Sequence, residues 1–178
     1  MNAPMDGDQL ARAMAAAVAN TGASLLDLSH RSPVLVVFLR HAGCPFCREA
    51  MADLARSRGT IAGGGTAIVV VYQWNPGEAD ELFERAGIGD LPRIADPDRV
   101  LYRAFGLRRG NLWQIASPFV LWRVVTAGAA GHRVGRVLGD AFQMPGTFLV
   151  HRGRVVREFR HRSQASRPDY AGFAGGQG

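Results

Sequence analysis

The stretch from Val34 to Arg48, which reads VLVVFLRHAGCPFCR, constrains the fold more than any other part of the chain. It begins as an unbroken apolar run, turns sharply, and continues as a Cys-x-x-Cys pair. An unbroken apolar run is typical of a central strand that is covered on both faces, as in parallel sheets. We therefore predict a buried strand over about Val34 to Arg40, with a cysteine pair directly beyond its carboxyl end.

The residues after the first cysteine have helical spacing, and they predict a helix that starts at the cysteines. The apolar side chains recur at i, i+3, i+4 and i+7, which places them on one face (Cys47, Ala50, Met51 and Leu54). We expect this helix to continue to about Arg58, because Gly59 stands where a C-terminal capping glycine belongs.

A cysteine at a helix start is a candidate nucleophile, because backbone N–H groups and the helix dipole lower the pKa of its thiol. Cys44 lies in the first turn and can face solvent, whereas Cys47 lies one turn later, on the inner side. This spacing predicts that Cys44 attacks an oxidant or a disulfide and that Cys47 then resolves the product. Arg40 and His41 are candidates for stabilising the thiolate, and the alternative is that both belong to a solvated turn.

The remaining elements alternate between helix and strand, and then end in a hairpin. We predict helices at about 8–19 and 24–30, a strand at 67–72, a helix capped by Asn75, a strand at 93–95, a helix from the Asp96–Asp98 cap to about Phe105, and a hairpin of strands 147–151 and 154–160. This order predicts an α/β protein with a mixed central sheet between two helical layers.

The same reading divides the chain into three parts. Residues 1–24 form an N-terminal helical extension, 25–170 form the main domain, and 171–178 form a flexible tail. Within the main domain, about 107–140 is an insertion that packs on the core. Its glycines interrupt any helix begun at Ser117, and Trp113 and Trp122 are expected to be buried anchors.

Composition excludes several classes of protein. The net charge is +6, but all 21 basic residues are arginines spread along the chain without interleaved aromatic residues, so we do not expect nucleic-acid binding. Two cysteines are too few for a secreted disulfide scaffold, and the five histidines lack zinc-ligand spacing. No apolar run is long enough to span a membrane, and Asp6 and Asp8 precede the N-terminal apolar patch, so we expect a cytoplasmic protein.

Four stretches resemble the thioredoxin superfamily, and specifically its peroxiredoxin-like group (the AhpC/TSA-like, selenoprotein-L-like and prostamide-synthase-like proteins). They are FLRHAGCPFCR from Phe38, ADPDRVLYRAFGL from Ala95, GDAFQMPGTFLV from Gly139, and HRSQASRPDY from His161. The resemblance implies a thioredoxin-like α/β/α sandwich and thiol redox activity. It also implies Cys44 as the reactive cysteine, Cys47 as its partner, and Pro145 as a cis-proline after Met144.

The sequence differs from ordinary peroxiredoxins at two positions. His41 stands three residues before Cys44, where a Thr is usual, and Val37 stands seven before it, where a Pro is usual. The accessory arginine of a peroxidase has two candidates, Arg40 and Arg123.

Three functions follow from these observations. The first is reduction of hydroperoxides by Cys44 with Cys47 as resolving residue. The second is a thioredoxin-like protein disulfide oxidoreductase, which the Cys-Pro-x-Cys spacing favours. The third is a non-catalytic protein that binds an acidic partner through the 107–140 region and the arginine-rich hairpin. We expect no bound cofactor or metal, an external thiol donor such as the thioredoxin or glutathione system, and no membrane partner; a homodimer is left open.

Overall fold

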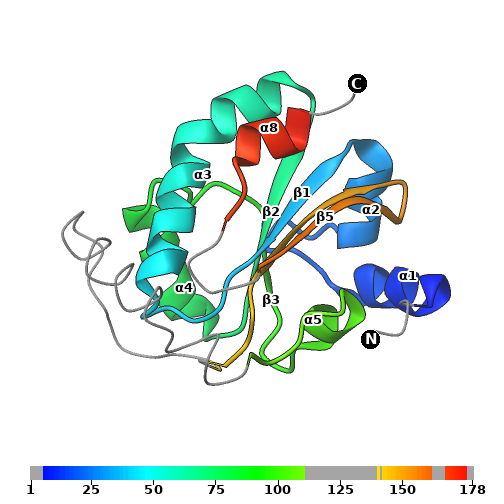
Figure 1. The fold of residues 1–178 in the computed structure, drawn as a ribbon, viewed down its shortest axis with the longest axis horizontal. Helices are drawn as coiled ribbons and strands as arrows, with labels where there is room; N and C mark the ends of the chain where they lie inside the picture. The colour runs from blue at the N-terminus through cyan, green and yellow to red at the C-terminus, as the bar shows by residue number, and fades with distance from the viewer. Residues whose placement is uncertain (1–5, 111–139, 141, 162–166, 176–178) are drawn as a thin grey trace.

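The computed structural model describes residues 6–110, 140, 142–161 and 167–175, and its centre is a five-stranded mixed sheet (Figure 1). The strand order is β3-β2-β1-β4-β5. The bounds are Val34–Phe38 for β1, Ala67–Tyr72 for β2, Arg93–Ala95 for β3, Gly146–His151 for β4 and Arg154–Arg160 for β5. β1 pairs with β2 in parallel and with β4 in antiparallel orientation, so it is central, as predicted.

Helices cover both faces of the sheet, which confirms the predicted α/β/α thioredoxin-like sandwich (Figure 1). One apolar cluster joins the sheet to α1 (Gly7–Ala16), α2 (Leu25–Arg31) and α5 (Val100–Ala104). The other joins it to α3 (Pro45–Gly63), α4 (Pro76–Arg85) and α8 (Tyr170–Gly175). Alternate residues of β1 enter the two clusters, because successive side chains of a strand point to opposite faces.

Several local signals act as the sequence predicts. The Asn75 side chain caps α4 by accepting a hydrogen bond from the backbone N–H of Gly77 at 2.9 Å, with Pro76 at the first helical position. In the β4–β5 hairpin, Arg152 and Gly153 both have positive φ, 50° and 74°. Two positive φ values are what a two-residue type I′ turn requires.

Some predicted boundaries are wrong. Helix α3 continues past Gly59 to Gly63, because the next turn buries Ile61 in the core, which offsets the roughly 1 kcal/mol cost of an internal glycine. Helix α1 stops at Ala16 rather than at residue 19, and the chain then forms an antiparallel bridge between Val18 and Ser24.

The cap of α5 also differs in detail from the prediction. The N-cap residue is Arg99, with a left-handed φ of 56°, rather than a residue of the Asp96–Asp98 segment. The Asp96 carboxylate still satisfies the helix start, because it accepts hydrogen bonds from the backbone N–H groups of Val100 and Tyr102 at 2.8 and 3.1 Å. The strand prediction of 34–40 likewise exceeds β1, which ends at Phe38.

The predicted flexible tail is wrong for Ala171–Gly175. These residues belong to α8, which packs beside the long helix α3 and buries Tyr170 and Ala174 (Figure 1). The predicted insertion at 107–140 lies largely outside the described residues, as do Trp113 and Trp122. Within the described ranges, no helix has the length and apolar character needed to cross a membrane.

Candidate active site at the Cys44–Cys47 pair

Both cysteines lie at the start of α3, directly beyond the carboxyl end of β1. Cys44 is the N-cap residue and Pro45 occupies the first turn, so the chain enters the helix at the cysteine itself. Both thiols are free and buried, with 1% of Cys44 and 4% of Cys47 exposed. The expectation that Cys44 faces solvent is therefore wrong.

Arg40 contacts both sulfur atoms. Its guanidinium Nη2 donates a hydrogen bond to Cys44 Sγ at 3.2 Å, and its backbone N–H donates to Cys47 Sγ at 3.3 Å. The Cys47 thiol in turn donates a hydrogen bond to the Cys44 sulfur. Cys44 thus accepts two side-chain hydrogen bonds, which is the environment that favours a thiolate.

These contacts separate the acidities of the two thiols. Burial alone would raise the pKa of Cys44, but the hydrogen bond from Cys47 and the charge and hydrogen bond of Arg40 lower it to about 6. The pKa of Cys47 is raised well above its usual value by its hydrogen bond to Cys44, by burial and by the charge of Cys44. At neutral pH, Cys44 is the thiolate and Cys47 is the thiol.

His41 is buried beside Arg40, and it is not a second positive charge. Burial, followed by the charge of Arg40, lowers the pKa of His41 to about 4, so the ring is neutral at pH 7. Its Nε2 lies 3.0 Å from Arg40 Nη2 and, in the neutral ring, can accept a hydrogen bond from it. His41 is therefore placed beside the guanidinium that contacts the Cys44 sulfur, without adding a charge to it.

A small cavity adjoins the sulfur atoms. Its volume is about 20 Å³, the space of about one water molecule. The wall is mainly apolar, and it joins the cysteine segment to parts of the chain that are distant in sequence (Val37, Phe38, Leu39, Arg40, Cys44, Phe46, Cys47, Ala50, Pro145, His161, Arg167 and Tyr170). Pro145 therefore lies beside the cysteines, as the resemblance implied.

The last three residues of this wall were not predicted to be site residues. His161 follows β5 and packs edge-on against Phe159, with ring centroids 5.1 Å apart. Arg167 forms ion pairs with Glu49 and Asp53 of α3. Tyr170, the first residue of α8, is 2% exposed, and burial raises the pKa of its phenol. The one signal in the sequence was the stretch from His161 to Tyr170, whose ends are both in the wall.

The remaining two expectations concern the peptide bond before Pro145 and the position of Arg123. The Met144–Pro145 bond is trans, since no peptide bond among the described residues is cis. Trans is the isomer that an X-Pro bond favours. Arg123, the second candidate for the accessory arginine, lies outside the described residues.

Within residues 6–110, 140, 142–161 and 167–175, no group of three or more His, Cys, Asp or Glu residues is placed to hold a metal ion. The two cysteines and Arg40 instead form a compact site for thiol chemistry.

Fold and site together define the class of protein: a thioredoxin-fold protein with a cysteine pair at the start of helix α3. The chain belongs to the AhpC/TSA antioxidant enzyme family, whose sequence profile matches residues 53–164, more than half of the chain. The matched residues begin after Cys47, so the family assignment does not depend on the cysteine pair.

Similar proteins point the same way. The chain is 29% identical over 151 residues to "Peroxiredoxin-like 2C" of Bos taurus, a match that covers 76% of this chain and 63% of that protein. It is 27% identical over 159 residues to "Prostamide/prostaglandin F synthase" of Salmo salar, covering 86% and 76%. The chain thus spans about 63% of the length of the peroxiredoxin-like relative.

Among solved structures, peroxiredoxin Q of Xanthomonas campestris superposes with a TM-score of 0.59 at 20% identity, covering 89% of this chain and 83% of that one. "Peroxidoxin BcpB" from Mycobacterium tuberculosis gives 0.58 at 18% identity, covering 89% and 86%. At these identities the likeness concerns the fold.

Proposed function

We propose that this protein reduces small hydroperoxides, with Cys44 as the nucleophile and Cys47 as the resolving thiol. The single observation that carries the proposal is the Cys44 sulfur beside a cavity of about 20 Å³, where hydrogen bonds from Cys47 and Arg40 and the charge of Arg40 lower its pKa to about 6. A thiolate in so small a cavity suits a substrate of the size of hydrogen peroxide. Membership of the AhpC/TSA family supports the same reaction class.

In the first step, the Cys44 thiolate attacks the terminal oxygen of the peroxide. An S–O bond forms and the O–O bond breaks, the leaving alkoxide or hydroxide takes a proton from water, and Cys44 becomes a sulfenic acid. Arg40 holds the sulfur and stabilises its negative charge before the attack. The reaction is therefore fastest when Cys44 is ionised, which its lowered pKa provides at pH 7.

In the second step, the sulfur of Cys47 attacks the sulfenic sulfur of Cys44. The S–S bond forms, the S–O bond breaks, and the hydroxyl leaves as water with the proton of Cys47. Once the first step has consumed the Cys44 thiolate, the charge that raised the pKa of Cys47 is gone. An external dithiol, such as a thioredoxin-type donor, then supplies two electrons and two protons to restore both thiols.

Consumption of hydrogen peroxide with dithiothreitol as donor tests this function. We expect turnover by the natural protein and none above background for Cys44→Ser, which keeps the size of the side chain and removes the thiolate. Equal rates for the two proteins would overturn the proposal.

A disulfide oxidoreductase is the second candidate, because a low-pKa cysteine paired with a high-pKa cysteine in a Cys-x-x-Cys motif also suits thiol–disulfide exchange. The 1% exposure of Cys44 counts against it, since a protein disulfide must reach the sulfur itself. Reduction of insulin disulfides separates the two functions. Insulin reduction without peroxide turnover would establish the second candidate in place of the first.

A further inference from the structure

We propose that Gln73 is a positioning residue: its carboxamide ties the loop that carries Arg40 to the loop at Asp140, and thereby holds Arg40 against both cysteine sulfurs. The inference rests on the proposed function only in taking Cys44 as the reactive thiol. It assigns a role in the site to a residue that does not contact the sulfurs, the cavity or a substrate.

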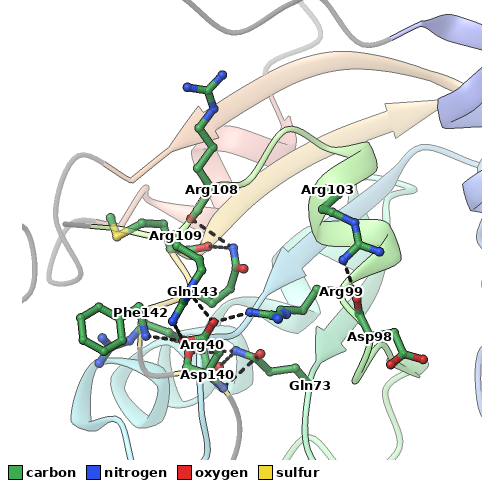
Figure 2. Close-up of polar contacts among 11 residues, drawn as sticks. Arg40, Gln73, Asp98, Arg99, Arg103, Arg108, Arg109, Asp140, Phe142 and Gln143 are labelled. Carbon is green, nitrogen blue, oxygen red and sulfur yellow. Dashed lines mark hydrogen bonds and ion pairs between the residues drawn. The ribbon is translucent and has the colours of Figure 1, made fainter.

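Gln73 directly follows β2, and 5% of it is exposed. Its Nε2 donates hydrogen bonds to the backbone carbonyl of Arg40 and, at 3.2 Å, to that of Asp140. Its Oε1 accepts a hydrogen bond from the backbone N–H of Asp140 at 3.2 Å. Figure 2 shows the carboxamide of Gln73 at the backbone of Asp140, with Arg40 beside them. A carboxamide has two donor hydrogens and one oxygen, and here both parts of the group are engaged.

The hydrogen bonds of Gln73, which we call the Gln73 clamp, lie just beyond the point where the backbone pairing of β1 and β2 ends. Beyond the end of β1, the backbone N–H of Leu39 still donates to the carbonyl of Val71 at 2.9 Å. The carbonyl of Leu39 accepts a hydrogen bond from the Tyr102 hydroxyl, and the following carbonyl, that of Arg40, accepts one from the side chain of Gln73. Gln73 thus extends the β1–β2 connection to the residue that contacts the sulfurs.

Arg40 is sensitive to such support because it contacts the sulfurs from two directions. Its backbone N–H points to Cys47 and its guanidinium to Cys44, at 3.3 and 3.2 Å. Hydrogen bonds weaken steeply as distance and angle depart from the ideal, so a small displacement of this peptide loosens both contacts. Release of Arg40 would weaken two of the interactions that lower the pKa of Cys44.

Asp140, the second residue that Gln73 contacts, is also held by interactions that do not involve Gln73. The Asp140 carboxylate forms ion pairs with Arg99 and, at 2.8 Å, with Arg109 Nε, and it accepts the backbone N–H of Phe142 at 2.9 Å (Figure 2). The chain then continues to Pro145, which lines the cavity. Gln73 therefore connects the two loops that flank the cysteine pair.

The rival explanation is that Gln73 only satisfies buried backbone groups and contributes to stability. Gln143 provides a matched control for it. This glutamine is 3% exposed, and its Nε2 donates to the carbonyls of Arg108 and Met144, both at 3.2 Å, without contacting Arg40 (Figure 2). A merely structural role predicts the same result for both glutamines.

The experiment compares Gln73→Met and Gln143→Met by the pH dependence of Cys44 alkylation with iodoacetamide, followed by mass spectrometry. We expect the midpoint for Gln73→Met to rise by about one pH unit, which lowers the alkylation rate at pH 6 about fivefold, and the midpoint for Gln143→Met to stay that of the natural protein. Thermal unfolding gives the stability of both variants. Gln73→Asn, which keeps a buried carboxamide too short to bridge the loops, replaces Gln73→Met if the latter does not fold, and the same shift is expected.

An unchanged midpoint in the Gln73 variant, or an equal shift in both variants, would overturn the positioning role. The alkylation requires no peroxide and no donor, so its outcome is independent of turnover. A shifted midpoint in a protein that never consumes peroxide would retain the role of Gln73 and reject the peroxidase function.

Discussion

Two regions meet at the cavity, and they contribute in different ways. The cysteine segment, residues 40–47, carries the groups that the described structure shows hydrogen-bonded to the two sulfurs, within eight consecutive residues of the chain. The C-terminal wall, which consists of Pro145, His161, Arg167 and Tyr170, is assembled by the fold from residues about a hundred positions later. We therefore expect the first region to set the ionisation of the thiol and the second to set which molecules can reach it.

This difference follows from the range of the interactions. Hydrogen bonds and a neighbouring charge shift a pKa over a few ångströms, so adjacent residues suffice. The C-terminal wall, in contrast, depends on tertiary packing. Buried Tyr170 and the ion pairs of Arg167 with α3 provide that packing. Variants of the cysteine segment should therefore change the chemistry, whereas variants of the C-terminal wall should change access.

The largest effect is expected for Cys47→Ser. Peroxide without a donor should convert the natural protein to the Cys44–Cys47 disulfide, with loss of two hydrogen atoms from the intact mass. The variant should stop at the Cys44 sulfenic acid, which dimedone traps, and should still consume its first equivalent of peroxide. If the variant instead fails to react with the first equivalent, Cys47 rather than Cys44 is the attacking residue.

Arg40→Met should have the next largest effect. It removes the cation that lowers the pKa of Cys44, so the rate with peroxide at pH 7 should fall about tenfold or more, and part of the loss should be recovered at pH 9. Stopped-flow kinetics at a series of pH values measure both the loss of rate at pH 7 and its recovery at pH 9. Arg58→Met is the matched control, because Arg58 pairs with Asp90 at the other end of α3, and its rate should stay within about twofold of the natural value.

Tyr170→Ala should change access and leave the thiol intact. Removing this buried ring from the cavity wall should raise the rate with cumene hydroperoxide relative to hydrogen peroxide by about threefold to tenfold, because the bulkier substrate gains room. Phe173→Ala is the control, since Phe173 packs on the core from α8 without lining the cavity. A Cys44 titration displaced by Tyr170→Ala would contradict the division between the two regions.

Arg167→Gln should give the smallest change at the thiol. The variant removes the ion pairs that Arg167 forms with the buried Glu49 and the partly buried Asp53, so urea unfolding should show a loss of about 2 kcal/mol, less than for a fully buried pair. The Cys44 titration should not move. Arg157→Gln, which removes an exposed contact to the Phe173 carbonyl, should cost less than about 0.5 kcal/mol. Equal losses of unfolding free energy in the two variants would show that the ion pairs of Arg167 do not stabilise the C-terminal wall.

Sequence predicted the cysteine segment better than the wall for the same physical reason. A buried strand, a turn and cysteines at a helix start are local patterns, so the strand over Ala67–Tyr72 and the position of Cys44 and Cys47 at the start of a helix followed from spacing, with Arg40 as one of the candidate contacts. Helix α8 has six residues, two of them glycines, and its stability comes from packing on α3. The residue pattern therefore predicted a flexible tail at 171–178, whereas the structure has helix α8 over residues 170–175.

Gln73 shows the same limit at a finer scale. A glutamine after a strand has no motif of its own. Its contact with Arg40 depends on the register of β1 and β2, which pairs Phe38 with Val71 and so brings the residues beyond these strands together. The trans bond before Pro145 was missed for a different reason. The resemblance implied a cis bond at the entry to β4, and the structure has a trans bond there.

The most direct test of the account is the titration of each cysteine in the natural, reduced protein, by alkylation across pH with the labelled residue identified by mass spectrometry. The account predicts that Cys44 is labelled with a midpoint at a pKa of about 6 and that Cys47 stays unlabelled until well above its ordinary range. A midpoint for Cys44 near that of a free thiol, about 8.5, or labelling of Cys47 before Cys44, would contradict it.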